Sequence, residues 1–538
     1  MRTTLLAFIL ASTCLIFQVC SAQNPVKIWE STFNGNLQGR DAARHILTDD
    51  SGNVYITGQS YHLFTGGNFS TIKYSNAGVQ QWADHYYSAQ QGYENTGKKL
   101  VMDKWGFVYA VGTLSINDGD LAVSKFGPGG RIWTKNYEPY WFSTYDDDGM
   151  DIAVDDSGYF YAIAEVTSPS GNLLDLYIMK CDSSGTKLWE DNYTGASASD
   201  YPTAIAVSPA GNAYPVLQSF NFFGTTTDDI TTIHYTTTGT QDWFSRYNGA
   251  GNATDYPTSI IADAAENTFV CGTADAGANN DLVAFKQNQY GTRLWTVTYN
   301  GTGNGNDTAV AIRYLPNGLV AITGTSRELV GGIARNAIVT MVCDSGNVLW
   351  TETYTGVTGN GAVCKGMDID PYGNIFICGY ETGTVYTDGV ILKYDSTGNL
   401  EWNEIYNGAA NMDDRFNSIC LDDSVNILVT GSAHTSAANS DYLTVKYGTQ
   451  VTIGIPNEVK TNPVSVYPNP ATGSISISGI AAGDEIRITG IRGELAYRSI
   501  VANGIHRLSL NDLGLSEGIY VVSVSNHKKT HHTKLVIQ

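Results

Sequence analysis

Residues 402–406 read Trp-Asn-Glu-Ile-Tyr, and a Trp followed four residues later by Tyr or Phe occurs eight times along the chain. The pairs are Trp29/Phe33, Trp82/Tyr86, Trp133/Tyr137, Trp189/Tyr193, Trp243/Tyr247, Trp295/Tyr299, Trp350/Tyr354 and Trp402/Tyr406. Successive Trp residues lie 53, 51, 56, 54, 52, 55 and 52 positions apart, a regular period that indicates a repeat array. Because positions i and i+4 of a strand face the same side, each copy can pack two large rings against a neighbouring copy.

Each unit also contains three shorter apolar runs separated by turns of Gly, Asn, Asp and Ser, which together with the Trp strand make the four strands of a propeller blade. The triplets begin near Asp41, Asn95, Asp147, Asp200, Asp255, Asp307, Ala362 and Asp414. The last triplet ends at Tyr447 with no Trp strand after it, whereas the chain opens with an unpartnered one at Trp29–Phe33. We therefore predict an all-β fold, an eight-bladed β-propeller over residues 23–448, in which the N-terminal strand completes the last blade and removes an open edge.

The units resemble the SBBP propeller repeat over about residues 24–447, through D..GN.Y.TG and KY…G…W patterns such as Asp49–Gly58 with Lys73-Tyr74. The name of that family implies seven blades, so a seven-bladed ring is the alternative to the eight that we count.

Both ends of the chain carry export signals. Residues 1–22 combine Arg2, an apolar run from Leu5 to Val19 and a small-residue exit, the pattern of a signal peptide. Residues 449–462 read as a linker, and the alternating pattern of residues 463–538 predicts a small immunoglobulin-like β-sandwich. Its Tyr467-Pro468-Asn469-Pro470 opening, Gly518–Val522 strand and Lys534–Ile537 finish resemble the C-terminal sorting domain of the type IX secretion system of Bacteroidota. That resemblance implies the secretion machinery as a partner, and a secreted or outer-membrane surface-attached protein.

Charge and cysteine content exclude several classes of function. The chain has a net charge of −21, and residues 23–462 hold 47 acidic against 23 basic groups, so we expect no nucleic-acid partner. No other apolar run is long enough for a transmembrane helix. The six cysteines after the signal lack zinc-site spacing and fit buried strand positions, while a Cys364–Cys378 bridge is an alternative for that pair.

Acidic residues recur at two positions of the repeat, and both fall on the same end of the blades. Six units begin with Asp, and every unit has Asp or Asn five residues before the Lys position of its third strand. We interpret these side chains as acceptors for loop N–H groups, with no cofactor required; calcium held between paired carboxylates is the alternative.

The connection between the second and third units is unlike any other. A segment that departs from the repeat is a candidate for a function, because residues that recur in every unit stabilise the repeat itself. It places Tyr140, Trp141, Tyr145, Asp146 and Asp147 together, so that aromatic rings could stack on a sugar while the carboxylates bond its hydroxyls. The alternative is a loop that plugs the mouth of the ring. We therefore predict a binding or presentation module for carbohydrate or protein ligands, and not an enzyme; a polysaccharide hydrolase or lyase using loop-face carboxylates is the second hypothesis.

Overall fold

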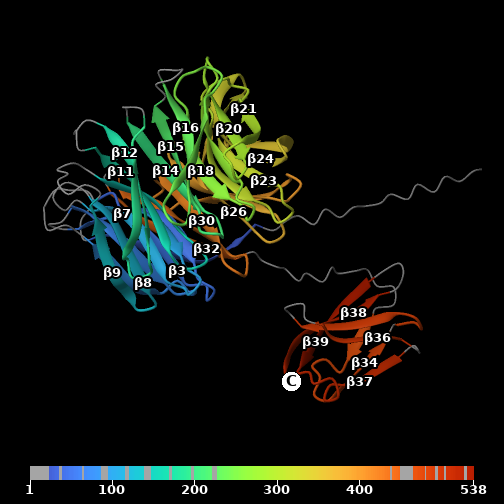
Figure 1. Ribbon diagram of the computed structural model, residues 1–538. Coiled ribbons are helices and arrows are strands. Elements are labelled where there is room, and N and C mark those ends of the chain that lie inside the picture. The colour runs from blue at the N-terminus through green and yellow to red at the C-terminus, as the bar shows by residue number, and fades with distance from the viewer. Residues whose placement is uncertain are drawn as a thin grey trace, which may run out of the picture. The chain divides into compact units, whose positions relative to one another are not determined.

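The computed structural model describes residues 24–35, 39–62, 66–86, 95–114, 120–138, 147–168, 173–195, 199–220, 227–436, 439–448, 464–478, 480–490, 495–501, 505–525 and 530–538. The chain divides into two compact units, residues 1–450 and 451–538. Every regular element in the described ranges is a β-strand, and the ribbon in Figure 1 is coloured along the chain. The all-β prediction is confirmed.

The first unit repeats one four-stranded antiparallel sheet, eight times within the described residues. We number the sheets I to VIII. Sheet I contains β2 (Ala42–Thr48), β3 (Val54–His62), β4 (Gly66–Tyr74) and β5 (Gln80–Tyr86). Sheet II contains β6 (Thr96–Met102), β7 (Val108–Leu114), β8 (Asp120–Gly127) and β9 (Gly130–Tyr137). Sheet III contains β10 (Asp148–Val154), β11 (Phe160–Thr167), β12 (Leu174–Cys181) and β13 (Lys187–Tyr193). Sheet IV contains β14 (Asp200–Val207), β15 (Ala213–Phe220), β16 (Asp228–Tyr235) and β17 (Gln241–Tyr247).

The second half of this unit continues the same order. Sheet V contains β18 (Tyr256–Ala262), β19 (Thr268–Asp275), β20 (Asn280–Gln287) and β21 (Arg293–Tyr299). Sheet VI contains β22 (Thr308–Tyr314), β23 (Val320–Val330), β24 (Ile333–Asp344) and β25 (Asn347–Tyr354). Sheet VII contains β26 (Ala362–Ile369), β27 (Ile375–Thr382), β28 (Thr387–Tyr394) and β29 (Leu400–Tyr406). Sheet VIII combines β30 (Asp414–Leu421), β31 (Ile427–Ser436) and β32 (Asn439–Gly448) with β1 (Val26–Phe33) from the start of the chain.

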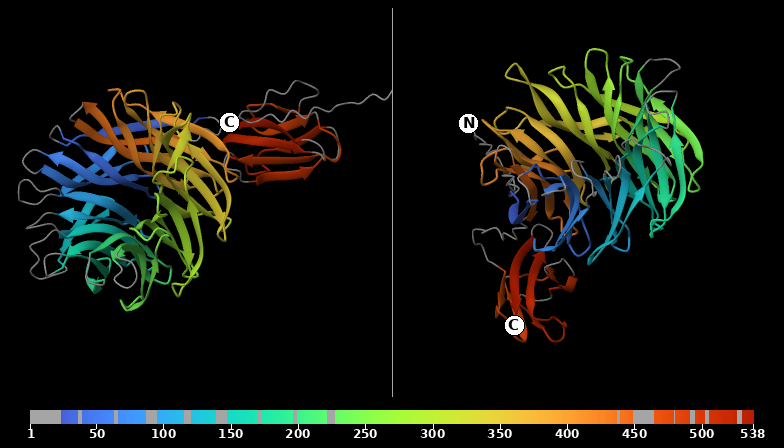
Figure 2. Two further views of the ribbon diagram at one scale, coloured as in Figure 1. Left: turned by 90° about the horizontal axis from the view of Figure 1, so that it is seen from above. Right: turned by 90° about the vertical axis from the view of Figure 1, so that its left-hand side faces the viewer.

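The sheets form a closed ring around their first strands. Each first strand lies beside the first strand of the next sheet, and β30 of sheet VIII lies beside β2 of sheet I. At this seam β1 runs antiparallel to β32, with Trp29 opposite Lys446 and Phe33 opposite Tyr442. Figure 2 shows the blue strands of the start of the chain beside the orange strands of sheet VIII. The arrangement is propeller-like, and its strand order places each Trp strand on the outside of its sheet.

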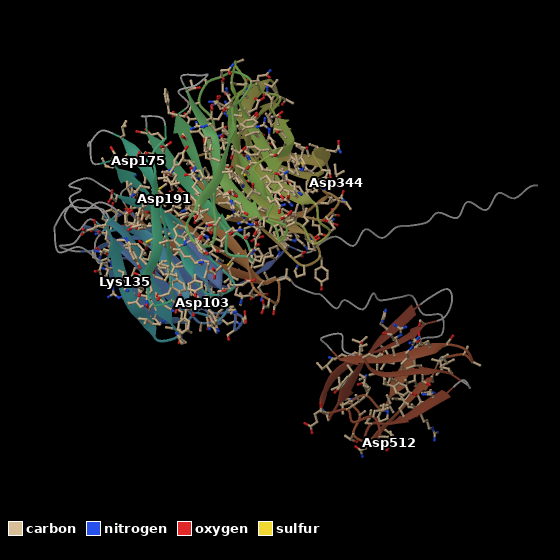
Figure 3. All side chains as sticks on the ribbon, in the orientation of Figure 1. Asp103, Lys135, Asp175, Asp191, Asp344 and Asp512 are labelled. Atoms are coloured by element: carbon tan, nitrogen blue, oxygen red, sulfur yellow. The ribbon has the colours of Figure 1, made fainter. Side chains whose placement is uncertain are left out.

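The buried apolar side chains lie at the boundaries between neighbouring sheets. Eight hydrophobic clusters of described residues each combine side chains from two neighbouring sheets. One example joins Val111 and Tyr109 of sheet II to Phe160 and Tyr177 of sheet III. Side chains therefore fill the spaces between the ribbons, as Figure 3 shows. Since each sheet is buried by its neighbours on both sides, the ring depends on closure for its stability.

The repeated Trp side chains contact a turn of the next sheet. The indole Nε1 of Trp189 in sheet III donates a hydrogen bond to the Thr237 carbonyl oxygen in sheet IV, at 3.1 Å. Its ring covers Gly239, whose φ of +86° suits glycine and where an added Cβ would lie 2.7 Å from the indole. Trp29, Trp82 and Trp243 donate to turn carbonyls in the same way. The expectation that these rings pack against a neighbouring copy is confirmed.

The second unit has two antiparallel sheets around one core. The strands are β33 (Ser465–Tyr467), β34 (Ser474–Ser478), β35 (Glu485–Gly490), β36 (Leu495–Ile500), β37 (Ile505–Ser509), β38 (Gly518–Ser525) and β39 (Thr530–Ile537). They are ordered β33-β34-β37 in one sheet and β36-β35-β38-β39 in the other. Ile475 and Ile477 of the first sheet share a cluster with Ile486, Val522 and Leu535 of the second. The immunoglobulin-like topology stays a prediction.

Candidate functional site

The loop predicted from the sequence as a site falls largely outside the described residues. Tyr140, Trp141, Tyr145 and Asp146 belong to the part that the structure leaves undescribed. Asp147, which precedes β10, is 1% exposed, and its Oδ1 accepts a hydrogen bond from the Thr167 backbone N–H at 3.2 Å. Asp147 therefore has a backbone-fixing role, and the predicted stacking platform stays a prediction.

The acidic residues that begin each unit accept loop N–H groups. Asp307 is representative: its two carboxylate oxygens accept from the Gly301 and Arg327 backbone N–H groups, each at 2.7 Å. Burial raises the pKa of Asp307 to about 6 against these hydrogen bonds, and the carboxylate of Asp281 in the preceding sheet adds to the rise. Within the described ranges no group of three or more His, Cys, Asp or Glu residues is placed to hold a metal ion. These contacts support the interpretation as backbone acceptors for the six Asp residues that begin units; in the second row Asp281 and Asp441 accept hydrogen bonds from the side chains of Asn279 and Asn439.

The six cysteines of the described residues are all free thiols, and Cys364 and Cys378 are not bridged. Five are buried and Cys420 is half-buried, as expected for small apolar residues in strands. Burial raises the pKa of Cys364 to about 11, so its thiol stays protonated at neutral pH.

Among the described residues, the positions whose residue types vary most between units lie on the first strands, in the middle of the ring. Every first strand contains a register shift two to four residues into the unit, in all eight sheets. A β-bulge of this kind inserts one extra residue, bends the strand and redirects side chains. The two residues at each bulge are Arg44-His45, Lys98-Lys99, Met150-Asp151, Thr203-Ala204, Thr258-Ser259, Val310-Ala311, Lys365-Gly366 and Asn417-Ser418.

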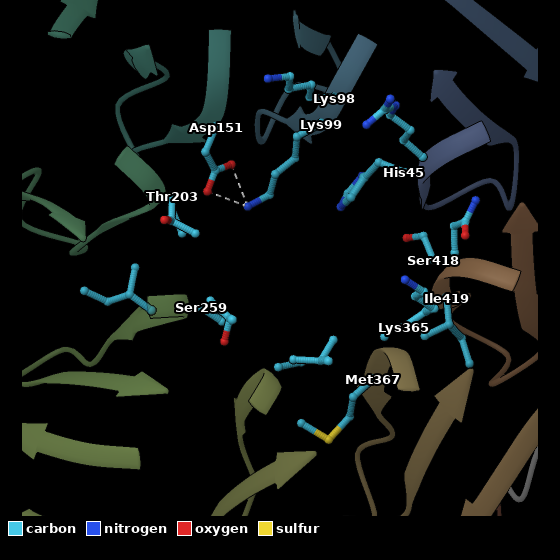
Figure 4. A pocket seen from close by; sticks show the side chains of 18 of the residues that line it. His45, Lys98, Lys99, Asp151, Thr203, Ser259, Lys365, Met367, Ser418 and Ile419 are labelled. Carbon is cyan, nitrogen blue, oxygen red and sulfur yellow. Dashed lines mark hydrogen bonds and ion pairs between the residues drawn. The ribbon is translucent and has the colours of Figure 1, made fainter. Parts of the chain in front are cut away.

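All sixteen of these residues line one cavity of about 470 Å³, the central channel of the ring. Ile260, Ile261, Arg313, Met367 and Ile419 complete the lining. Figure 4 shows the labelled side chains surrounding an open space, with Lys98, Lys99 and Asp151 near one another and Lys365 and Ser418 elsewhere on the wall. The first strand of each sheet is paired with the second strand and lies beside the first strands of both neighbouring sheets, so the channel is a preformed site.

The charge of the channel is opposite in sign to that of the chain. Its lining contains five basic side chains, Arg44, Lys98, Lys99, Arg313 and Lys365, but one carboxylate, Asp151. The whole chain carries −21. The total charge, which disfavours a nucleic-acid partner, therefore does not describe this local surface.

Two of the five basic groups are neutralised by neighbours. Lys99 Nζ lies 2.6 Å from Oδ1 of Asp151. The second oxygen of Asp151 also accepts the Ile205 backbone N–H at 3.0 Å, so this carboxylate links sheets II, III and IV. Lys98 Nζ lies 2.7 Å from Oδ2 of Asp148.

The other three basic groups have no ion pair within the described residues. Arg44 and Lys365 are exposed, and Arg313 is half-buried with one hydrogen bond, to the Ile312 carbonyl oxygen at 3.0 Å. They come from sheets I, VII and VI, which are consecutive around the ring apart from sheet VIII, where Asn417 occupies the bulge. One arc of the channel therefore carries uncompensated positive charge.

His45 adds a neutral donor to this arc. Burial, followed by the charges of Lys99 and Arg313, lowers its pKa to about 3, so the ring is uncharged at neutral pH. Its Nδ1 accepts the Leu100 backbone N–H at 3.4 Å, which assigns the ring proton to Nε2. The imidazole thus supplies one N–H donor without a positive charge.

The arc formed by sheets III to V differs in chemistry. It contributes the hydroxyls of Thr203, Thr258 and Ser259 and the apolar side chains of Met150 and Ile260. The channel therefore has a cationic side and a side of hydroxyls and hydrocarbon.

The sequence contains a pattern that indicates this site, although the prediction from the sequence placed the site in a loop. The residue types at the bulge positions change in every unit, whereas the strand positions around them repeat. The residues that vary between units therefore lie on the first strand of each unit, and not only in the loops.

The comparisons with known proteins concern mainly the end of the chain. Residues 465–538 match the secretion system C-terminal sorting domain. This tail is a type IX sorting domain and indicates a secreted or cell-surface protein, so the prediction of a sorting domain is confirmed. The described residues form no helix long and apolar enough to cross a membrane. No curated protein matches the chain.

Several solved structures resemble the chain at low identity. A protein of unknown function from Bacteroides caccae is 14% identical, with a TM-score of 0.34, covering 58% of this chain and 97% of its own. PorZ, a surface component of the type IX secretion system of Porphyromonas gingivalis, is 12% identical, with a TM-score of 0.29 and coverage of 92% and 81%. Sqt1 from Chaetomium thermophilum is 11% identical, with a TM-score of 0.47 and coverage of 79% and 99%. With TM-scores below 0.5, none of these likenesses bears on function.

Proposed function

We propose that the first unit is an eight-bladed propeller that acts, after export, as a binding and presentation module, and that its ligand enters the central channel. The observation that carries the proposal is the set of eight bulged strands, which place sixteen residues of varied type around one cavity. A repeated residue stabilises the repeat, whereas varied residues at two equivalent positions of every unit form a surface that is specific to this chain.

The scaffold suits binding because its walls are held in place before a ligand arrives. Each inner strand is paired within its sheet and packed against both neighbours, and side chains such as Asp151 are fixed by several hydrogen bonds. Preorganised walls reduce the ordering cost of binding. The sequence-based expectation of a carbohydrate or protein ligand fits a lining rich in hydroxyls and charged groups.

The hydrolase or lyase hypothesis requires carboxylates that are free to exchange protons or attack. Glycoside hydrolysis commonly uses two such groups on opposite sides of the bond. In the channel lining the one carboxylate, Asp151, is held by Lys99 and two backbone N–H groups. Turnover would thus need groups other than those of the channel.

The test is to screen the purified mature protein on a glycan array and to measure release of reducing ends from the glycans that bind. Binding without release supports a binding module, and turnover supports the enzyme hypothesis. The site is tested with Thr203→Trp, which places a bulky ring in the channel, and with Val79→Trp, in an exposed turn, as the control. Thr203→Trp should abolish binding of each selected ligand while Val79→Trp leaves it unchanged. Equal binding by both variants would place the site elsewhere, with the loop around Trp141 as the next candidate.

A further inference from the structure

We propose that the ligand of the central channel is an acidic sugar, a small hydroxylated ring that carries a carboxylate, sulfate or phosphate group. This inference rests on the proposed function, because it assigns a chemical class to the ligand of the same cavity.

The first argument is the unpaired charge of Arg44, Arg313 and Lys365. Three cations on neighbouring walls of one channel repel one another, and the described carboxylates neutralise Lys98 and Lys99 instead. Burial raises the pKa of Asp368 and the charge of Arg313 partly opposes that rise, but the two form no ion pair, and the oxygens of Asp368 accept the Ile369 and Leu421 backbone N–H groups. A bound anion would supply the missing countercharge on this arc.

The second argument is the chemistry of the remaining wall. Thr203 and Ser259 offer hydroxyls that can donate and accept hydrogen bonds, whereas the Thr258 hydroxyl donates to the Cys271 carbonyl oxygen at 3.2 Å and offers only its acceptor side; Ile260 offers an apolar surface. A simple inorganic anion would use the cationic arc and leave this wall without a partner. A sugar ring uses both, since it has hydroxyls at its edge and C–H groups on its faces.

The third argument is size and the charge outside the channel. A cavity of about 470 Å³ lies in the range of small-molecule sites. The surrounding chain carries −21, so a long polyanion would be repelled wherever it extends beyond the channel. The combination favours a small acidic ligand or the end of a glycan over a polymer bound along its length.

The experiment measures binding to the full mature protein by isothermal titration calorimetry. The probes are glucuronate, glucose 6-phosphate and glucose 6-sulfate, with glucose and inorganic phosphate as the neutral-ring and free-anion comparisons. We expect at least one acidic sugar to bind, and glucose and phosphate each to bind at least about tenfold more weakly, the ratio that one net hydrogen bond provides. The three acidic probes distinguish which acidic group the channel prefers.

The variants Arg44→Gln and Lys365→Gln should each lower the affinity for that acidic sugar by about 10- to 150-fold, the loss expected for a hydrogen bond to a charged group. Lys187→Gln is the matched control, because Lys187 is an exposed residue of the outer strand β13. This substitution should leave the affinity for the acidic sugar unchanged. Both channel residues are exposed, so their loss should leave the melting temperature unchanged.

Three results would overturn the inference. The first is that every acidic probe binds with a dissociation constant above about 1 mM. The second is that glucose or phosphate binds as tightly as the acidic sugars. The third is that the glutamine variants bind the acidic sugar as tightly as the parent does. If Thr203→Trp still removes binding of an array ligand in any of these cases, the proposed function stands and only the ligand class is wrong. If Thr203→Trp has no effect on any ligand, both proposals are wrong.

Discussion

Lys446→Met should markedly destabilise the ring at the seam between sheets VIII and I. Lys446 Nζ lies 2.7 Å from Oδ2 of Asp422, and the side chains are 2% and 5% exposed. The ammonium also donates to the side chain of Asn76 in sheet I. Methionine keeps an unbranched apolar stem but removes the charge, which leaves the Asp422 carboxylate buried without its cation. Breaking a buried pair in this way costs about 3–5 kcal/mol of unfolding free energy.

Lys393→Met is the matched control because Lys393 occupies the same position of the repeat in sheet VII. Its Nζ lies 2.7 Å from Oε2 of Glu401, but the side chains are 16% and 30% exposed, so water can replace the lost partner. An ion pair of this kind contributes about 0–1 kcal/mol. The two substitutions therefore remove the same group at the same distance and differ mainly in burial.

Urea denaturation followed by tryptophan fluorescence compares the midpoints of the parent, both single variants and Lys446→Met/Asp422→Asn. The double variant should recover much of the loss, because replacing both partners leaves no buried charge. Burial would raise the pKa of Asp422, but hydrogen bonds from Lys446 and Asn426 outweigh it and hold the pKa below its ordinary value. Equal losses in Lys446→Met and Lys393→Met, or a double variant no more stable than Lys446→Met, would refute the reasoning.

Burial raises the pKa of Asp255 and Asp307 to about 6, so the folded state holds protons that the unfolded state releases between about pH 4 and 6, and stability should fall as pH rises through that window. The melting temperature of the parent relative to that of Asp307→Asn should therefore be higher at about pH 5 than at about pH 7.5, a comparison that cancels the opposite effect of His45, whose lowered pKa makes its protonation favour the unfolded state; an unchanged or reversed difference contradicts the argument. Gly239→Ala should cost more than Gly318→Ala, because both have φ near +85° but only the first places a Cβ against Trp189, and equal urea midpoints would disprove it. A chain ending at residue 447 with an ordinary signal peptide should fold yet stay periplasmic in a type IX host, and its detection outside the outer membrane by immunoblot would defeat the sorting role. Trp141→Ala should weaken glycan binding by about 1–3 kcal/mol if the loop is a stacking platform, and a drop in melting temperature with unchanged affinity identifies a plug instead.

The parts of this protein that depend on local or repeated patterns could be predicted from the amino-acid sequence. The Trp period, the turns and the period-2 runs predict repeated four-stranded sheets, because strand content and hairpin turns are set by residues close together in the chain. The unpartnered first strand at Trp29–Phe33 predicts its place beside the last triplet, and β1 lies against β32. The sorting domain was recognisable because its motifs at Tyr467–Pro470 and Gly518–Val522 are contiguous.

The position of the candidate site depends on the packing of the eight sheets and could not be predicted from the sequence. A bulge such as that at Arg44 is a mismatch between two paired strands, so a single strand's residues do not reveal it. Arg44, Arg313 and Lys365 are far apart in sequence, and they face one cavity only because the ring brings the first strands of eight sheets together. Total charge does not reveal the basic channel because it averages over the whole surface, whereas binding depends on the charges that line the channel.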